Sequence, residues 1–152
     1  MKSILFVCLG NICRSPMAEA IFRNMVSKTG RENDFFIDSA GTSSCNQGLP
    51  ADSRAAAELA RHGLSTQHKA RQIEEEDFDN FDYILAMDRD NYKELLWLAD
   101  ENENGKSKVM MFRKFDPDGN GNVPDPYYGG KKGFEDVFKI CERTCCSLLE
   151  KL

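Results

Sequence analysis

The sequence predicts an α/β protein with one open, four-stranded, mostly parallel sheet and helices on both faces. Four short apolar runs alternate with longer stretches whose apolar residues recur at helical spacing, which is typical of parallel sheets with crossover helices. The chain has 152 residues, the size of one domain, so we expect a single domain over residues 1–152. A glycine-containing loop follows the first apolar run, as in phosphate-binding α/β proteins.

The first half of the chain is expected to supply two strands and two helices. Ile4–Val7 and Phe35–Ile37 are the apolar runs, and each is predicted to be a short strand. Between them, Met17–Lys28 has apolar residues at helical spacing and is predicted to be a helix. Either residue of Asp52–Ser53 can cap a second helix over Arg54–Arg61.

The middle of the chain continues the same alternation. Glu74–Asp77 is predicted to be a solvated helical turn, because acidic side chains suit a helix N-terminus. Phe81–Met87 is the third strand, and Asp88–Leu98 is the helix that follows it. The inner face of that helix is expected to hold Tyr92, Leu95, Leu96 and Trp97.

The chain is expected to finish with a strand, a long loop and a helix. Lys108–Phe112 is the fourth strand, Phe115–Gly133 the loop, and Phe134–Leu152 the closing helix. Within the loop, Asp116–Gly121 imitates the first half of a calcium-binding loop. Since Tyr127 stands where such a loop needs a bidentate glutamate, we expect an ordinary turn-rich loop.

The segment Cys8–Pro16, between the first strand and the first helix, is predicted to carry the chemistry. Backbone N–H groups of such a loop and of the helix N-terminus can surround one tetrahedral anion, and their field favours a thiolate. Five residues separate Cys8 from Arg14, which lets the thiol lie below the anion and the guanidinium beside it. The planar fork of Arg14 matches two oxygens of a phosphoryl group.

The other residues of this loop suit the same task. Gly10 and Asn11 are compatible with left-handed backbone angles. Ser15 can cap the helix and donate its hydroxyl to the thiolate, while Pro16 suits the first helical position. Taken singly, Cys8 is more typical of a buried strand end than of a nucleophile. The combination with Gly10, Asn11 and Arg14 favours a reactive anion site.

Asp125–Gly129 is the second segment that indicates chemistry. Attack of a thiolate on a phosphate monoester needs an acid that protonates the leaving oxygen, and Asp125 on a mobile loop beside Tyr127 and Tyr128 fits that role. The alternative is a turn that carries two surface tyrosines.

Composition excludes several other classes of function. The net charge of −5 argues against a general binder of nucleic acid or of membrane surfaces. The sequence has no signal peptide and no apolar stretch long enough to span a membrane, so we expect a cytoplasmic protein with its six cysteines reduced. Cys141, Cys145 and Cys146 lie far in sequence from His62 and His68, and we expect no metal and no cofactor.

The two segments expected to carry the chemistry, Cys8–Pro16 and Asp125–Gly129, resemble motifs of one known family. Cys-Leu-Gly-Asn-Ile-Cys-Arg-Ser-Pro at 8–16 and Asp-Pro-Tyr-Tyr at 125–128 resemble the motifs of the low-molecular-weight protein tyrosine phosphatases. Asp38–Gly41, His68–Gln72 and Phe81–Asp88 also resemble family segments, in family order. The resemblance therefore covers nearly the whole chain.

The resemblance implies a hydrolase that forms a phosphocysteine. Cys8 would attack phosphorus, Arg14 would hold the equatorial oxygens, and Asp125 would protonate the tyrosyl oxygen and then activate water. Ser15 would assist the leaving thiolate. The implied substrate is a phosphotyrosine-containing protein or a small aryl phosphate, and we expect a monomer.

The resemblance also implies supporting residues. Asn11 would keep the loop wound through hydrogen bonds with Ser39 and His68. The residues expected to bind the phosphate or the aromatic ring of the substrate are Leu9, Gly10, Asn11, Ile12, Cys13, Ser15, Tyr127 and Tyr128. Cys13 shares the loop with Cys8, which predicts a reducible disulfide between them on oxidation.

Two positions bear on the substrate. Members active on phosphotyrosine usually carry an aromatic residue where Cys45 stands, so one wall of the ring site is missing and the substrate preference stays open. The similar protein-arginine phosphatases have threonine where Ile12 stands, and Ile12 favours tyrosine.

Two other functions remain as alternatives. A thiol-dependent arsenate reductase shares this loop and fold but needs a pair of redox cysteines near Tyr83–Asp90, where the sequence has none. A catalytically silent module would bind phosphate without turnover.

Overall fold

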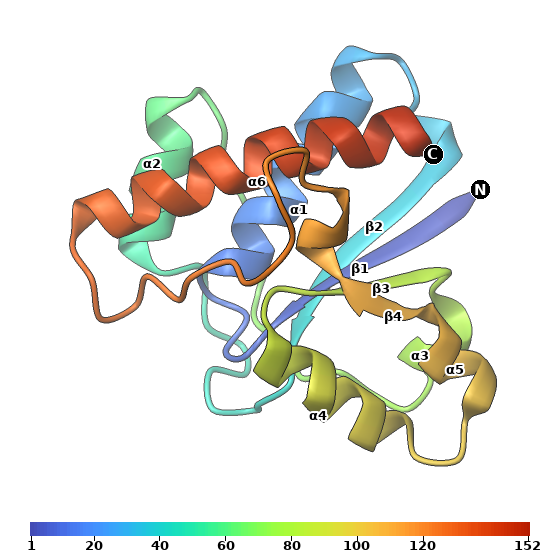
Figure 1. The fold of residues 1–152 in the computed structure, drawn as a ribbon. Helices are drawn as coiled ribbons and strands as arrows, with labels where there is room; N and C mark the ends of the chain where they lie inside the picture. Colours follow the sequence, from blue (N-terminus) through green and yellow to red (C-terminus); the bar gives the residue numbers. More distant parts are fainter.

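The computed structural model describes residues 1–152, and a four-stranded sheet lies at its centre (Figure 1). The strands are β1 (Lys2–Cys8), β2 (Phe35–Gly41), β3 (Tyr83–Ala86) and β4 (Val109–Met111). Their order is β2-β1-β3-β4, and every neighbouring pair is parallel. The predicted fold class is therefore confirmed, with a sheet that is wholly rather than mostly parallel.

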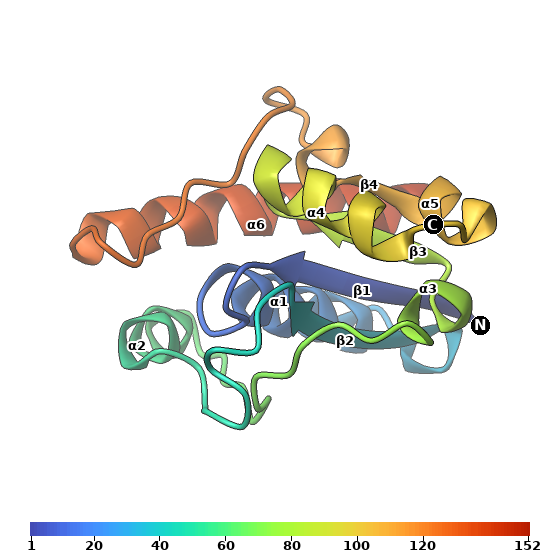
Figure 2. The same cartoon turned by 90° about the horizontal axis from the view of Figure 1, so that it is seen from below.

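Helices cover both faces of the sheet (Figures 1 and 2). They are α1 (Arg14–Lys28), α2 (Ser53–Arg61), α3 (Asp77–Asn80), α4 (Arg89–Ala99), α5 (Glu103–Lys108) and α6 (Lys131–Lys151). Helices α1, α2 and α6 pack against one another on one side, and α3, α4 and α5 do so on the other. None of these helices is long and apolar enough to cross a lipid bilayer.

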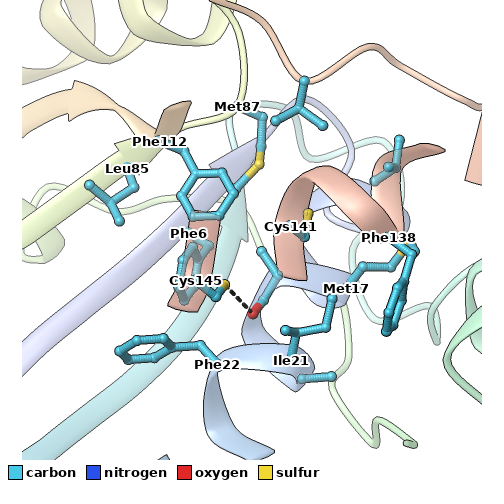
Figure 3. Close-up of a cluster of buried hydrophobic side chains, with 14 of the residues drawn as sticks. Phe6, Met17, Ile21, Phe22, Leu85, Met87, Phe112, Phe138, Cys141 and Cys145 are labelled. Carbon is cyan, nitrogen blue, oxygen red and sulfur yellow. Dashed lines mark hydrogen bonds between the residues drawn. The ribbon is translucent and has the colours of Figure 1, made fainter. Parts of the chain in front are cut away.

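Strand β1 is apolar on both sides because each side contributes to a different core. Ile4 and Phe6 point into the larger cluster with α1 and α6, whereas Leu5 and Val7 point into the cluster under α4. The ring of Phe6 meets the rings of two other phenylalanines edge to face in the larger cluster (Figure 3). The run of four apolar residues thus places the carboxyl end of β1 in the middle of the molecule.

Helix α6 has two cysteines in this larger core. Cys141 and Cys145 are fully buried, and the thiol of Cys145 lies 3.7 Å from the carbonyl oxygen of Ala18 (Figure 3). Burial raises the pKa of Cys141 to about 12, so its thiol stays protonated at neutral pH. These two cysteines pack as small apolar side chains.

The expectation for the inner face of α4 is wrong at one residue. Trp97 is 73% exposed, whereas Leu95 and Ala99 are buried. Residues two apart in a helix point in nearly opposite directions, so a face that holds Leu95 cannot also hold Trp97. Tyr92 and Leu96 are half-buried at its edge.

Helix α5 and two short 3₁₀ turns, Glu32–Asp34 and Phe112–Phe115, were not predicted. Asn102 precedes α5, and its side chain accepts a hydrogen bond of 2.8 Å from the backbone of Gly105. The pair Asn102-Glu103 is a recognisable helix start. A helix of six residues has too few apolar positions to show a period.

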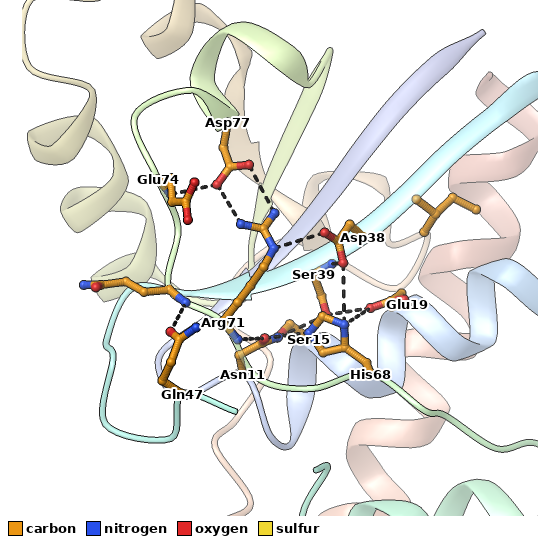
Figure 4. Close-up of polar contacts among 12 residues, drawn as sticks. Asn11, Ser15, Glu19, Asp38, Ser39, Gln47, His68, Arg71, Glu74 and Asp77 are labelled. Carbon is orange, nitrogen blue, oxygen red and sulfur yellow. Dashed lines mark hydrogen bonds and ion pairs between the residues drawn. The ribbon is translucent and has the colours of Figure 1, made fainter. Parts of the chain in front are cut away.

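The acidic run before α3 is only partly solvated. Glu74, Glu75 and Glu76 are exposed, but Asp77 is buried and accepts hydrogen bonds of 2.9 and 3.1 Å from the guanidinium of Arg71 (Figure 4). The prediction of a wholly solvated turn is therefore wrong for Asp77. A bidentate arginine compensates the buried carboxylate.

Asp116 is likewise an anchor for arginines. Its buried carboxylate accepts hydrogen bonds of 2.8 Å from Arg113 and of 2.9 and 3.1 Å from Arg143 of α6. The resemblance of this segment to a calcium loop therefore has a structural explanation, because the carboxylate ties the loop to the last helix.

Replacing Asp116 should destabilise the fold in a pH-dependent way. Burial raises the pKa of Asp116, but hydrogen bonds from Arg143, the Asp118 backbone and Arg113 outweigh it and hold the pKa below its usual range. A lowered pKa stabilises the fold above the unfolded value of about 3.9, and this contribution is lost as pH falls through the folded value. Asp116→Ala should cost about 2 kcal/mol at pH 7, less than a fully buried pair because Arg143 is one-third exposed.

Urea unfolding measures this effect. The deficit of Asp116→Ala relative to the wild type should shrink as the pH is lowered below about 4. The control is Asp118→Ala, since Asp118 is exposed and lies 3.5 Å from the same arginine; it should change stability by less than about 1 kcal/mol. An equal deficit at pH 7 and pH 3 would contradict the explanation.

Candidate active site

The loop that follows β1 lies at the carboxyl edge of the sheet. From β1 the chain passes through α1 to β2 on one side, whereas β3 pairs with β1 on the other, so the loop lies where the strand order reverses. Open α/β sheets bind ligands at this position. A hollow opens here, lined by Cys8, Leu9, Gly10, Asn11, Ile12, Cys13, Arg14, Cys45, Asn46, Asp125, Tyr127 and Tyr128.

The backbone of the loop differs from expectation at Gly10. Asn11 has the left-handed conformation, with φ of 57°, but Gly10 does not. Gly10 instead provides space, because a Cβ there would come within 2.5 Å of the Asn46 amide nitrogen, which donates to the Gly10 carbonyl. Gly41 of β2 has a similar role, since its Cβ would lie 2.6 Å from the Leu9 carbonyl oxygen.

Ser15 does not cap α1. The helix begins at Arg14 with Cys13 as its N-cap residue, so Ser15 and Pro16 are the second and third helical residues. The Ser15 hydroxyl faces the loop instead, where it lies 3.0 Å from the Cys8 sulfur and accepts a hydrogen bond of 2.8 Å from the Asn11 amide. Because Asn11 supplies one hydrogen, the hydroxyl hydrogen is free to point at the sulfur.

Cys8 lies at the floor of the hollow. Its sulfur is almost fully buried and accepts a hydrogen bond of 3.3 Å from the backbone N–H of Asn11, in addition to the Ser15 contact. Two donors aimed at one sulfur can stabilise negative charge on it. The arrangement suits a nucleophile.

The side chain of Asn11 is buried at the centre of a polar network (Figure 4). Its amide nitrogen donates to Ser15 and, at 3.0 Å, to Ser39. Its amide oxygen accepts from the His68 ring at 2.7 Å and from the Arg71 backbone at 3.0 Å. All hydrogen-bonding groups of the amide are therefore paired, which holds a non-glycine residue in the left-handed conformation.

The carboxylates of Glu19 and Asp38, which the sequence did not single out as site residues, lie around this network and support it. The Ser39 hydroxyl donates to the buried carboxylate of Glu19 at 2.6 Å, and His68 lies between Glu19 and Asp38 at 3.4 and 3.5 Å (Figure 4). These three side chains are close enough to hold a cation. Arg23 already neutralises Glu19 at 2.8 Å, and Arg71 neutralises Asp38 at 3.1 Å.

Arg14 is buried and held from one side. Its Nη1 donates to Asp88 at 2.6 Å and to the carbonyl of Val123 at 3.1 Å. Burial lowers the pKa of Arg14, but the charges of Cys8, Asp88 and Asp125 outweigh it, so the pKa stays above its usual range. Nε and Nη2 remain free to bind two oxygens of an anion.

Asp88 is an anchor that sequence reasoning missed. It caps α4 by accepting a hydrogen bond of 2.7 Å from the Asn91 backbone, and its other oxygen binds Arg14. Asp88 lies two residues after the buried strand β3, at the carboxyl edge of the sheet, and this position could have indicated a role in the site.

Asp125 lies at the mouth of the hollow. Its carboxylate is 41% exposed and lies 3.7 Å from Nη2 of Arg14. The rings of Tyr127 and Tyr128 follow, perpendicular to each other with centroids 5.0 Å apart, but Tyr128 is 94% exposed and forms little of the wall. Cys45 is exposed on another part of the rim.

Cys13 is buried in the same loop. Desolvation and the negative charge of Asp52 raise its pKa to about 12, so it is a thiol at neutral pH. Its chemistry therefore differs from that expected of Cys8.

Known proteins match this chain along nearly its whole length. A family model described as low molecular weight phosphotyrosine protein phosphatase matches residues 3–152. A protein of that name from Sus scrofa is 46% identical over 151 residues, which cover 99% of this chain and 96% of the relative.

Solved structures agree with the sequence comparison. A protein tyrosine phosphatase from Entamoeba histolytica, crystallised with Hepes in its active site, has a TM-score of 0.94 and 43% identity, with 99% of this chain and 96% of that chain covered. A Drosophila arginine phosphatase has a TM-score of 0.91 and 38% identity, with coverage of 99% and 97%. From the extent of these matches, together with the loop geometry, it follows that the chain belongs to the low-molecular-weight protein tyrosine phosphatase family.

Proposed function

We propose that this protein hydrolyses phosphotyrosine and small aryl phosphate monoesters through a phosphocysteine intermediate. One observation carries the proposal: Cys8 lies at the floor and Asp125 at the mouth of the same hollow, with the anion-binding groups of the loop between them. The nucleophile and the acid would then act on opposite sides of one phosphoryl group.

In the first step, the Cys8 thiolate attacks phosphorus while the bond from phosphorus to the phenolic oxygen breaks. The loop N–H groups and the free edge of Arg14 hold the three phosphoryl oxygens, where charge develops. Asp125 donates its proton to the leaving oxygen, so tyrosine or phenol departs neutral.

In the second step, water attacks the phosphocysteine and Asp125 accepts a proton from it. The sulfur leaves as a thiolate, which the Ser15 hydroxyl at 3.0 Å and the Asn11 N–H can stabilise. The partial exposure of Asp125 gives water access to this side of the phosphoryl group.

The rim of the hollow is proposed to select an aromatic substrate. Leu9, Ile12 and Tyr127 supply apolar surface, whereas Cys45 supplies less than an aromatic ring would. Because a solved relative bears the name of an arginine phosphatase, the preference between phosphotyrosine and phosphoarginine is the point to test.

Turnover of matched phosphotyrosine, phosphoserine and phosphoarginine peptides tests the proposal. We expect kcat/KM on phosphotyrosine to exceed that on the other two by at least about tenfold. The phosphoserine side chain is too short to reach both the floor and the rim, and the guanidinium of phosphoarginine is more polar than a ring that packs against Leu9, Ile12 and Tyr127. A higher kcat/KM on phosphoarginine would reassign the substrate. Tight vanadate binding without turnover of any peptide would indicate a silent binding module.

We also propose that the protein is a cytoplasmic monomer. A reversible disulfide between Cys8 and Cys13 is proposed to protect the nucleophile from further oxidation. Peroxide would convert the Cys8 thiolate to a sulfenic acid, and the Cys13 thiol would condense with it, forming the disulfide and releasing water. The reducing cytoplasm would keep both cysteines as thiols until an oxidant acts.

A further inference from the structure

We infer that Arg54 is a positioning residue for the general acid, holding residues 125–130 over the phosphate-binding loop. The inference rests on the proposed function, because it takes Asp125 as the acid. Arg54 belongs to the first turn of α2, far from Asp125 in sequence, and Figure 1 shows α2 beside the start of α6, where the acid segment ends.

The acid segment is packed into the fold at Val123 and Pro126 but is exposed from Tyr127 to Gly130. Before Asp125, Val123 is fully buried, its N–H donates to Met87 at 2.7 Å, and its carbonyl accepts from Arg14. After Asp125, Pro126 is buried, but Tyr127 is 44% exposed and Tyr128 almost wholly exposed. The second half of the segment therefore depends on contacts from elsewhere in the fold.

Arg54 supplies such contacts at three places. Its guanidinium carbon lies 5.3 Å from the centroid of the Tyr127 ring and 4.8 Å from that of Phe134, the buried ring in the first turn of α6. Its Nη1 lies 3.4 Å from the carbonyl oxygen of Gly129. One planar cation thus contacts the segment just after Asp125, near its end, and on the helix that follows.

Arg54 is itself fixed to the phosphate-binding loop. Its Nε and Nη2 each lie 3.0 Å from an oxygen of Asp52, a bidentate pair. The backbone N–H of Asp52 donates to the carbonyl of Ile12 at 2.8 Å. A continuous path therefore joins Ile12, through Asp52 and Arg54, to the acid segment.

This path matters because proton transfer needs Asp125 within hydrogen-bond reach of the leaving oxygen. A misplacement of about 1 Å can reduce a rate by a hundredfold. Arg54 does not reach the reacting atoms in this proposal; it acts through the position of Asp125. A lysine would keep the charge but not the planar face or the paired donors.

Two substrates with different leaving groups distinguish positioning of the acid from a general structural role of Arg54. Phenyl phosphate has a poor leaving group that needs the proton, whereas p-nitrophenyl phosphate has a good one that needs it less. Arg54→Met should lower kcat/KM on phenyl phosphate by about tenfold or more and on p-nitrophenyl phosphate by less than about threefold, since kcat/KM excludes the hydrolysis of the phosphocysteine that both substrates share. Arg54→Lys should resemble Arg54→Met more than the wild type.

Arg61→Met is the matched control. Arg61 lies on the same helix, is 40% exposed compared with 41% for Arg54, and pairs with Glu58 as Arg54 pairs with Asp52. It should turn over both substrates at the wild-type rate. Vanadate affinity should be unchanged in all three variants, because the phosphate-binding loop stays intact.

A double variant completes the test. If Arg54 acts through Asp125, adding Arg54→Met to Asp125→Asn should cause no further loss on phenyl phosphate. The same fold loss in both backgrounds, or equal losses on both substrates, would overturn the inference. Should Arg54→Met unfold, Arg54→Lys serves in the same comparisons. Failure of the proposed function is distinct, since the wild type itself would then hydrolyse neither substrate.

Discussion

Cys8→Ser should abolish hydrolysis of aryl phosphates, lowering kcat by at least about 10⁴-fold. The serine hydroxyl stays protonated at neutral pH and is a weak nucleophile, even with the Asn11 N–H and the Ser15 hydroxyl directed at its position. Phosphate and vanadate should still bind, because Arg14 and the loop N–H groups remain. Release of p-nitrophenol and vanadate titration measure the two effects.

Cys146→Ser is the control for this substitution. Cys146 is an exposed cysteine on α6 outside the hollow, so its loss should leave kcat unchanged. Acid quenching during turnover should trap phosphate on the wild-type protein and on Cys146→Ser but not on Cys8→Ser. Full turnover by Cys8→Ser would rule out the phosphocysteine route.

Asp125→Asn should lower kcat/KM on phenyl phosphate by about 10²- to 10³-fold. The amide can occupy the same place beside Arg14 but cannot donate an acidic proton to the leaving oxygen or accept one from water. The loss should be smaller on p-nitrophenyl phosphate, whose leaving group departs more readily without a proton. Steady-state rates on the two substrates measure the difference.

Asp118→Asn is the matched control for the acid. Asp118 lies earlier in the same long loop, is well exposed and contacts Arg143 rather than the hollow. Its substitution should not change kcat on either substrate. An equal loss of kcat/KM on both substrates would contradict a role of Asp125 in leaving-group protonation, because hydrolysis of the phosphocysteine, which both substrates share, does not enter kcat/KM.

The local features of this protein could be read from its sequence. The apolar run Ile4–Val7 predicted a short strand, and the interval between Cys8 and Arg14 predicted a loop around one anion. Neither depends on distant residues, because the periodicity of an element and the closure of a short loop follow from local backbone geometry. The ends of the elements were predicted less well, because they depend on packing and capping: the strand expected over Phe35–Ile37 extends to Gly41, and the helix expected from Phe134 begins at Lys131.

Only the tertiary structure decided which distant groups complete the site. Asp88 holds Arg14 across a separation of 74 residues, and Arg54 meets the ring of Tyr127 because α2 packs beside the start of α6. Of the two roles predicted for Ser15, the contact with Cys8 is present and the helix cap is not, because Asn11 binds the hydroxyl within a buried network. Such contacts depend on how strands and helices pack, and no local pattern encodes them. The sequence by itself predicted the nucleophile, the anion loop and a mostly parallel sheet; packing decided which distant groups surround them.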